Sequence, residues 1–444
     1  MRISKEIIER IEGEANLELE WEEGRVCDAR VKFVNFRGIE TILEGRHPMD
    51  ALVISPRVCG ICSHSHANAA VLALESCYES ARFALKCTPK AELIRQIILN
   101  AEKIQNHLKW FGLSIVPELS KADKQNAPIL GDTKALWSKM HEAYTLSLRM
   151  GAIFSGQWPH GSFVIPGGVC VDPMGSDILQ ASGALGGVQK IVESVLLGER
   201  LEDALGWNNL SDILKSDGFL SKIVQVLSQE KWANLGQSHD QFIVLGIENG
   251  KGALKSMKTR LVNVNPDYVS ESLAHTFFEA NGYTYSKSAQ YKKRYFETGP
   301  LARMMVSKNS LIRDLHRRFK DGLINRIIAR MFECVYLIHE TKELLSKIDL
   351  TQPSFVPPPI PIEQLESRGV GIVEAARGSL MHQVSIKGGK IDKYDIITPT
   401  VWNLGNGTKN APSVIQKALI GTKSVEEADM IFRGFDVCSV CTTQ

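Results

Sequence analysis

The sequence predicts a mainly helical α+β fold, in which a central bundle of long helices belongs to one large interlocked domain. Long stretches in the middle of the chain place apolar residues at i, i+3 and i+4, which is typical of buried helices. Segments near both ends alternate apolar and polar residues, which predicts small antiparallel β elements. Neither internal repeats nor low-complexity segments divide the 444 residues. Within a single domain 1–444, we expect a β-rich region over 1–56, a helical core over 57–350 and a β/α region over 362–444.

The N-terminal region contains a predicted β-hairpin. Residues 17–35, LELEWEEGRVCDARVKFVN, alternate apolar and polar side chains on both sides of a Glu-Gly turn. A period of two places alternate side chains on opposite faces of a strand. We therefore expect two antiparallel strands joined by a tight turn.

Helical periodicity then dominates as far as residue 347. The stretch over 308–347 is the longest and keeps its apolar spacing for many turns, which predicts a central bundle helix. The helical stretches cover 66–112, 132–154, 176–205 and 308–347.

A proline-rich segment, QPSFVPPPIP at 352–361, ends the helical core, because neither a helix nor an inner strand accommodates it. Residues 368–400 follow and read as antiparallel strands around the Gly388-Gly389 turn. Short helices are expected near 411–421 and 424–433, before the C-terminal tail.

The composition argues against several functional classes. The chain has 52 Lys and Arg against 50 Asp and Glu, a net charge of +2, which is too balanced for a protein that binds nucleic acid or a membrane surface. No apolar run approaches the length of a membrane span, and the acidic N-terminal stretch resembles neither a secretory signal nor a transit peptide. We therefore expect a cytoplasmic location, although export or membrane association through a partner is compatible with the sequence.

The cysteines carry the strongest chemical signal. An odd number, nine, in a large chain without a signal sequence favours reduced thiols over a disulfide scaffold. Four of them form two Cys-x-x-Cys pairs, Cys59 with Cys62 and Cys438 with Cys441. Each pair can present two sulfurs to one metal, and four thiolates make a soft site that suits zinc, iron or nickel.

Two common roles of such pairs fit this chain poorly. A structural zinc is the commonest, but zinc ribbons separate their pairs by about 15–20 residues, whereas these pairs lie far apart in the sequence. A thioredoxin-like redox pair lies at a helix N-terminus within a βαβ unit, a context that neither pair has. Because the second pair lies near the C-terminus, it can close the site after the rest of the chain has folded and the metal has been inserted. This order suits an elaborate cofactor.

Seven motifs occur in order between residues 10 and 441, and together they are far more specific than any one alone. They are RIEG at 10–13, RGIE at 37–40, RVCGICSHSH at 57–66, PH at 159–160 with GGV at 167–169, EAARG at 374–378 with His382, TPTVWN at 398–403, and DVCSVC at 436–441. This set resembles the large, catalytic subunit of nickel–iron hydrogenases.

The resemblance implies a nickel–iron centre that cleaves H2 reversibly into protons and electrons. In that family all four thiolates bind nickel. Cys59 and Cys438 would be terminal nickel ligands, while Cys62 and Cys441 would also bridge to an iron that carries cyanide and carbon monoxide. Soft thiolates stabilise nickel in several oxidation states, and two bridging sulfurs hold the metals close together.

The resemblance also implies protein partners for the iron's diatomic ligands. Arg377, Pro399 and Thr400 match the family positions that surround these ligands. Guanidinium and hydroxyl donors suit the nitrogen of cyanide, and an apolar surface suits carbon monoxide.

Heterolytic cleavage of H2 needs a base near the nickel and an exit for the proton. A terminal cysteine thiolate can accept the proton, and Glu12 matches the family's proton-relay glutamate. Arg377 would also help to polarise H2, with Asp436 as the partner that its buried guanidinium needs. His66 matches an imidazole that donates to a bridging sulfur.

Several positions depart from the family pattern. Glu14, Asn106, Ala376 and Val437 stand where the family commonly has His, Asp, Pro and Pro. Mature family chains usually end in His, which binds a buried magnesium or iron together with the glutamate that matches Glu40. This chain ends in Gln444 instead. Because an amide oxygen can bind a hard cation, the resemblance implies a magnesium site at Glu40 and Gln444.

The electrons released from H2 must leave through another protein, because the five remaining cysteines lack the spacing of iron–sulfur ligands. The family supplies an obligate small subunit with iron–sulfur clusters, docked near the first cysteine motif through a large interface. Maturation proteins for metal insertion are also implied, and a larger oligomer of heterodimers is compatible with the sequence.

Three other functions share parts of this pattern. A regulatory hydrogen sensor would have the same site. The quinone-binding subunit of respiratory NADH dehydrogenase would share the fold but lacks the cysteine pairs. A zinc-stabilised interaction protein would need only the four thiols.

Overall fold

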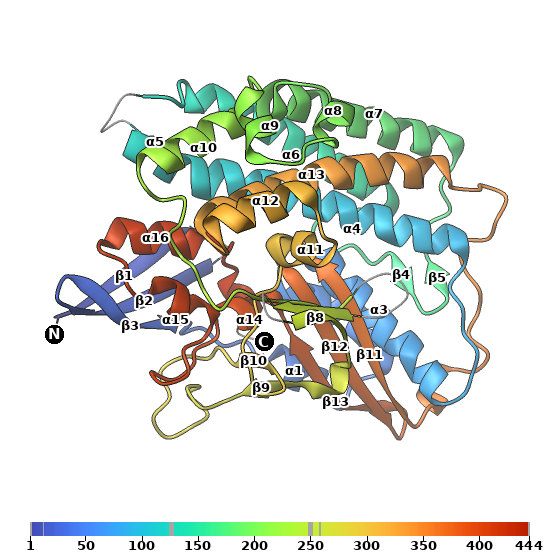
Figure 1. Cartoon of the computed structure of the whole chain (residues 1–444). Coiled ribbons are helices and arrows are strands. Elements are labelled where there is room, and N and C mark those ends of the chain that lie inside the picture. The colour runs from blue at the N-terminus through green and yellow to red at the C-terminus, as the bar shows by residue number, and fades with distance from the viewer. Residues whose placement is uncertain (1, 12, 124–127, 247–251, 257–258, 443–444) are drawn as a thin grey trace.

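Long helices form one side of the molecule and small sheets the other (Figure 1). The computed structural model describes residues 2–11, 13–123, 128–246, 252–256 and 259–442. The long helices pack against one another through aliphatic side chains and form a single buried core. They are α4 (Pro89–Trp110), α6 (Thr133–Ser155), α7 (Gly175–Ile191) and α13 (Leu323–Ser346). The predicted fold class, mainly helical with small antiparallel sheets, is confirmed.

Helix α13 is preceded by a separate helix, α12 (Ser310–Phe319), so the prediction of one helix over 308–347 is wrong. Lys320 has φ 54° and ψ −145°, and Gly322 is the N-cap of α13. These backbone angles lie far from those of a right-handed α-helix, so the helix ends there. The apolar spacing continues across this break, which explains why the sequence pattern concealed it.

Only some of the remaining helices fall within the other predicted helical stretches; the helices that begin at Ile39, Ala51, Val116, Leu210, Phe219, Pro300 and Pro399 were not predicted. Residues 66–112 contain two helices, and the two short helices near the C-terminus are present as α15 and α16. The helices are α1 (Ile39–Leu43), α2 (Ala51–Ile54), α3 (Ser63–Ser80), α5 (Val116–Asp123), α8 (Leu201–Ala204), α9 (Leu210–Lys215), α10 (Phe219–Gln229), α11 (Pro300–Val306), α14 (Pro399–Leu404), α15 (Val414–Leu419) and α16 (Val425–Gly434).

The N-terminal sheet contains the predicted hairpin. Strands β2 (Gly13–Glu22) and β3 (Arg25–Lys32) pair antiparallel, with Leu17 opposite Val31. Strand β1 (Arg2–Ile11), which the sequence did not predict, pairs with β2 on its other side. The apolar face of this sheet packs against α15 and α16, so residues from both ends of the chain share one buried cluster.

The C-terminal sheet packs directly on helix α3. Its three antiparallel strands, β11 (Ser367–Ala375), β12 (Gly378–Lys387) and β13 (Lys390–Ile397), confirm the predicted strands around the Gly388-Gly389 turn. A Cβ atom added at Gly371 would lie 1.9 Å from the carbonyl oxygen of Ala69, and one at Gly369 would lie 2.0 Å from that of Ala73. Glycine is therefore required where β11 crosses the helix backbone. This contact positions α3, whose first turn follows Cys62.

Short strands in the middle of the chain were not predicted. They are β4 (Val164–Ile165), β5 (Gly168–Val169), β6 (Gln241–Val244), β7 (Gly252–Ser256), β8 (Thr259–Val264), β9 (Val269–Ser272) and β10 (Ser288–Tyr291). The expectation that β structure is confined to the two ends of the chain is therefore wrong. Strands of two to six residues are too short for a clear alternation of side chains.

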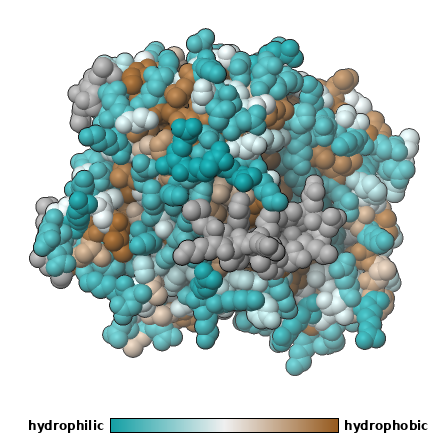
Figure 2. All heavy atoms as spheres, in the orientation of Figure 1, coloured by the Kyte–Doolittle hydropathy of each residue, from teal (hydrophilic) through white to brown (hydrophobic). Residues whose placement is uncertain are grey.

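The surface is largely polar. On the face shown in Figure 2, hydrophilic residues predominate and hydrophobic residues occur in scattered groups. In the described part of the chain, no helix combines the length and the apolar character that a membrane span requires.

Candidate metal centre

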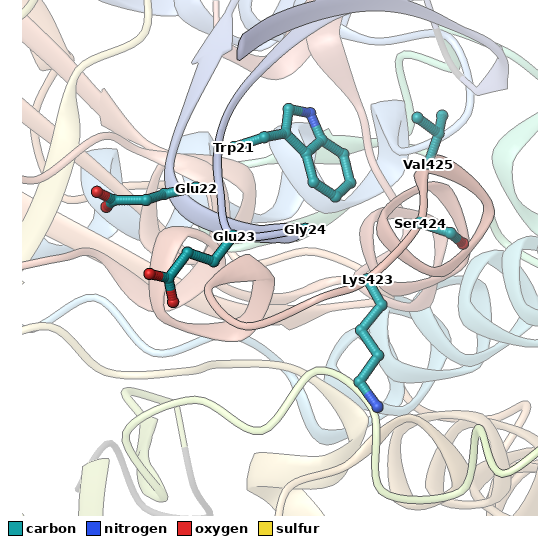
Figure 3. Close-up of a pocket in the computed structure, with 7 residues that line it drawn as sticks. All are labelled: Trp21, Glu22, Glu23, Gly24, Lys423, Ser424 and Val425. Carbon is teal, nitrogen blue, oxygen red and sulfur yellow. The ribbon is translucent and has the colours of Figure 1, made fainter. Parts of the chain in front are cut away.

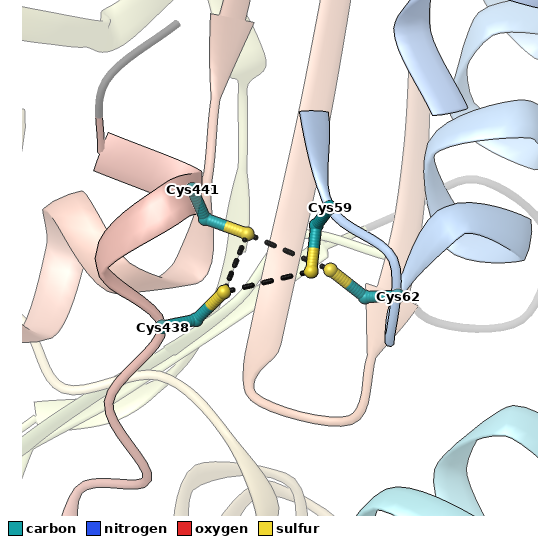
Figure 4. A group of neighbouring side chains, drawn as sticks. All are labelled: Cys59, Cys62, Cys438 and Cys441. Atoms are coloured by element: carbon teal, nitrogen blue, oxygen red, sulfur yellow. Dashed lines mark hydrogen bonds between the residues drawn. The ribbon is translucent and has the colours of Figure 1, made fainter. Parts of the chain in front are cut away.

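Four cysteine sulfurs from distant parts of the chain meet in the interior (Figure 4). Cys59 and Cys62 lie in the loop before α3, and Cys438 and Cys441 lie in the C-terminal tail. The four Sγ atoms are within 4.8 Å of one another. The Cys59–Cys438 distance is 3.6 Å, the Cys62–Cys441 distance 3.5 Å and the Cys438–Cys441 distance 3.0 Å. All four side chains are buried, so this cluster is a closed donor set of the kind predicted.

The four thiols influence one another's ionisation, because their sulfur atoms are in contact. Contacts with Cys438 and Cys441 raise the pKa of the Cys62 thiol well above its usual range. Burial opposes ionisation of Cys438, but contacts with Cys441 and Cys59 and the charge of Arg377 outweigh it and hold its pKa well below the usual range. Thiolates this close repel one another, so all four cannot be charged without a compensating positive charge. A soft divalent metal supplies that charge.

Glu102 of α4 fixes the start of helix α3 beside the first cysteine pair. Its carboxylate accepts hydrogen bonds from the backbone N–H of His64 at 2.7 Å and of Ser65 at 3.0 Å, and from the Ser65 hydroxyl. A carboxylate is favoured at a helix N-terminus, where the backbone N–H groups lack partners. Burial raises the pKa of Glu102 to about 7, although these hydrogen bonds favour its charged form. Sequence reasoning missed this residue.

Two further side chains of α4 hold the Cys59–Cys62 loop. The amides of Gln105 and Asn106 both donate to the carbonyl oxygen of Ile61, at 3.0 Å and 2.7 Å. With Glu102 they form a polar stripe at i, i+3 and i+4 on a buried helix. This stripe is the sequence signal that could have identified them, because buried polar side chains need partners.

Arg37 joins the two cysteine loops. Its guanidinium donates to the carbonyl oxygen of Arg57 at 3.1 Å, to that of Val58, and to that of Val440 at 2.6 Å. The tail is also held by Thr398, whose hydroxyl donates to the carbonyl oxygen of Cys441 at 2.8 Å. These bonds place the C-terminal pair against the first pair.

Arg377 and Asp436 lie together beside the cysteines, as predicted. The Arg377 guanidinium is buried and donates to Asp436 Oδ1 at 3.0 Å, to the Asp436 backbone oxygen at 3.0 Å and to Asn106 Oδ1 at 3.1 Å. Burial opposes the charge of Arg377, but Asp436 and the thiolates of Cys438 and Cys62 raise its pKa well above the usual range. The guanidinium therefore stays positively charged beside the sulfurs.

A second buried arginine shares Asp436. Arg330 Nη1 lies 2.9 Å from Asp436 Oδ2, and its guanidinium carbon lies 4.7 Å from the centre of the Trp110 ring. Burial lowers the pKa of Arg330 to about 10, although Asp436 opposes this. Asp436 is thus held between two cations, which fixes its position.

His66 lies in a buried row of three side chains. Its Nδ1 lies 3.0 Å from Nε2 of His382, whose Nδ1 lies 2.8 Å from the Tyr394 hydroxyl. Burial lowers the pKa of His66 to about 4 and that of His382 well below its usual range. Both imidazoles are therefore neutral at pH 7. The predicted donation from His66 to a bridging sulfur stays a prediction.

Pro399 and Thr400 begin helix α14 and are both buried. Within the described residues, the Thr400 hydroxyl has no hydrogen-bond partner. A buried hydroxyl without a partner is costly, so this one has a free donor for a bound group. This observation fits the predicted role of Thr400 next to a diatomic ligand.

Two predicted site residues, Glu12 and Gln444, lie outside the described residues. Glu40, the other predicted magnesium ligand, is described: one carboxylate oxygen accepts from the backbone N–H of Ile396 at 2.8 Å and the other from Lys287 at 2.7 Å. The expected magnesium site is therefore not supported.

A surface depression of about 680 Å³ lies at the turn between β2 and β3 and the start of α16 (Figure 3). It is lined by Trp21, Glu22, Glu23, Gly24, Lys423, Ser424 and Val425. None of the predicted site residues lines it, and it takes no part in the metal centre.

Known proteins share both the fold and the sequence pattern of this chain. The periplasmic [NiFeSe] hydrogenase large subunit of Desulfomicrobium baculatum is 26% identical over 487 residues, which cover 95% of this chain and 89% of the relative. The hydrogenase-2 large chain of Escherichia coli K12 is 24% identical, with 99% and 96% covered. The reduced Ni-Fe-Se hydrogenase structure from D. vulgaris Hildenborough shares the fold at a TM-score of 0.85, 24% identity and full coverage of both chains.

The first of these relatives is named as a periplasmic enzyme, so the comparisons do not support the expected cytoplasmic location. The family model described as nickel-dependent hydrogenase matches residues 37–117 and 251–444, more than half of the chain and all four clustered cysteines. The chain therefore belongs to the nickel-dependent hydrogenase family, whose members are oxidoreductases that act on H2.

Proposed function

We propose that this chain is the catalytic subunit of a nickel–iron hydrogenase that cleaves H2 heterolytically into protons and electrons, in a reaction that is reversible in principle. The observation that carries the proposal is the buried cluster of four cysteine sulfurs. The permanently charged Arg377 lies beside this cluster and is held by Asp436.

Each cysteine of one pair has a neighbour in the other pair. The first members of the two pairs, Cys59 and Cys438, are neighbours, and so are the second members, Cys62 and Cys441. In the proposal, Cys59 and Cys438 would bind nickel alone, and Cys62 and Cys441 would also bind an iron that carries two cyanides and one carbon monoxide. When bound, this centre supplies two adjacent metals that bind and polarise H2.

Three residues would hold the iron's diatomic ligands. Arg377 offers a buried guanidinium, and Thr400 offers a buried hydroxyl that has no partner in the described part of the chain. Pro399 contributes a buried apolar surface next to that hydroxyl. Such contacts orient ligands and tune a metal centre.

The proton from H2 would pass from a terminal cysteine sulfur to the carboxylate of Glu12. Support for this route comes from Gly13, which packs against the C-terminal tail: a Cβ added there would lie 2.0 Å from Oγ of Ser439. Ser439 follows Cys438 directly, so Gly13, the last residue of the RIEG motif, lies near the C-terminal cysteine pair. A carboxylate at this place can accept the proton and pass it towards solvent.

The electrons would leave through an iron–sulfur small subunit. In the described residues, no second group of three or more metal-binding side chains gathers away from the four cysteines. An exposed apolar surface near the first cysteine motif, residues 57–66, supports docking of a partner there. Phe36, which precedes Arg37, is 44% exposed, and its ring lies 5.4 Å from that of Phe278, which is 54% exposed. Exposed apolar patches of this kind mark interaction sites.

Infrared spectroscopy of the protein matured in its native host tests the proposal. We expect absorption bands from cyanide and carbon monoxide, together with one nickel per chain. Absence of these bands, or one zinc and no nickel per chain, would overturn it. Fast turnover with an artificial electron acceptor would argue against a dedicated hydrogen sensor.

A further inference from the structure

Lys287 lies between two carboxylates, close to the C-terminal tail that contains Cys441. Lys287, just before β10, places its Nζ 2.7 Å from Oε2 of Glu40 in α1 and 3.1 Å from Oε2 of Glu271 in β9. The three side chains are only 12–15% exposed. Loss of one partner from such a shielded triad leaves a buried charge unpaired, which is costly.

The donors around Glu40 do not fit a divalent cation. Both carboxylate oxygens are already used, one by the backbone N–H of Ile396 and the other by Lys287. Magnesium needs six oxygen ligands in near-octahedral geometry, and an ammonium group in contact with Glu40 and Glu271 repels it. The amide N–H and the ammonium are donors, so they occupy the positions that a metal would take.

We infer that the ammonium group of Lys287 takes the place of a divalent cation in this chain and joins α1, β9 and β13 next to the C-terminal tail. The link to the tail is short. Ile396, which donates to Glu40, lies just before Thr398, and the Thr398 hydroxyl donates to the carbonyl oxygen of Cys441. The ammonium group of Lys287 thus helps to hold the C-terminal tail at the metal centre, and no second metal is needed there.

The charges agree with this arrangement. Burial opposes the charge of Lys287, but Glu271 and Glu40 outweigh it and raise its pKa above the usual range. Burial raises the pKa of Glu271 to about 7 and also raises that of Glu40, while Lys287 opposes both shifts. The lysine therefore stays charged at neutral pH and balances a carboxylate there.

Magnesium analysis and thermal unfolding of the purified holoenzyme test this inference. We expect the wild-type protein, equilibrated with MgCl2 and then dialysed, to hold no stoichiometric magnesium. Its melting temperature should be the same in EDTA and in MgCl2. One magnesium per nickel, lost in Glu40→Gln, would overturn the inference.

Substitution of the lysine provides the second measurement. Lys287→Gln removes the ammonium, so we expect the melting temperature to fall by about 3 °C or more and magnesium to bind where the wild type excludes it. Lys387→Gln, at an exposed lysine, should change neither quantity. A Lys287→Gln protein with the wild-type melting temperature, or one that takes up no more magnesium than the wild type, contradicts the inference. Nickel content and infrared bands are read separately, so a failure here is distinct from a failure of the proposed function.

Discussion

Arg377 and Asp436 are joined by two hydrogen bonds, because the guanidinium contacts both the carboxylate and the backbone oxygen of Asp436, each at 3.0 Å. Asp436 has φ 55°, a left-handed conformation that is uncommon for a residue with a side chain. In this conformation, Oδ1 and the backbone oxygen of Asp436 both face the guanidinium of Arg377. The planar fork of arginine fits such a pair of acceptors.

Replacement of Arg377 by lysine should therefore impair catalysis while the metals stay bound. Lysine keeps the positive charge but cannot contact Asp436 twice and Asn106 at the same time. We expect kcat for H2 oxidation to fall by about 10²-fold, with normal nickel content and intact infrared bands. Arg368→Lys, at an exposed position of β11, is the matched control. Wild-type kcat in Arg377→Lys would show that the geometry of the guanidinium is unimportant.

Replacement of Cys441 by serine should prevent assembly of the metal centre. A hydroxyl is a harder and weaker ligand for a soft metal than a thiolate. We expect the nickel content of purified Cys441→Ser to fall roughly tenfold or more. Cys170→Ser alters an exposed cysteine and should retain full nickel. Equal nickel in both variants would exclude Cys441 as a ligand.

Replacement of Glu102 by glutamine tests how the first cysteine loop is held. Glutamine has one acceptor oxygen where the carboxylate has two, so one of the N–H groups of His64 and Ser65 loses its partner. We expect the free energy of unfolding to fall by about 1–3 kcal/mol, measured by urea denaturation. Glu92→Gln, at an exposed position of the same helix, should have little effect. Equal stability of the two variants would contradict this role of Glu102.

The predicted site residues were recognisable because each lies within a local motif. The cysteine pairs and the EAARG and TPTVWN segments are short, and their order along the chain made the pattern specific. Structure added what no local pattern contains. Glu102 acts on a helix that begins nearly forty residues before it, and its partner is the backbone of His64 and Ser65 rather than a side chain.

The contacts of Lys287 likewise join residues that are far apart in the sequence, so the sequence does not predict them. Lys287 meets Glu40 from a distant part of the chain, and nothing in the flanking residues of either one indicates the pairing. In the fold, the break at Lys320 was hidden because apolar spacing continued through it. The sequence therefore predicted the cysteine cluster better than the contacts that support it.

Replacement of Glu12 by glutamine should block proton transfer without loss of the metals. Glutamine is similar in size but cannot accept and release a proton. We expect kcat to fall by about 10²–10⁴-fold, whereas the nickel content and infrared bands stay unchanged. Glu14→Gln, at an exposed residue two positions away, is the control. Full activity of Glu12→Gln would remove Glu12 from the proton route.

Replacement of Glu271 by glutamine should change how stability depends on pH. Burial raises the pKa of Glu271 from its ordinary value of 4.5 to about 7, against the opposing charge of Lys287. Between these values the folded protein keeps a proton that the unfolded chain releases, so the stability that Glu271 contributes is lost as the pH rises through about 7. Glutamine stays neutral, and Lys287 keeps Glu40 as its partner. Urea denaturation should therefore give Glu271→Gln a gain over the wild type that increases by about 2–3 kcal/mol from pH 5 to pH 8, whereas Glu279→Gln, at an exposed position, gives none. A difference that is constant with pH would show that Glu271 is ionised throughout this range.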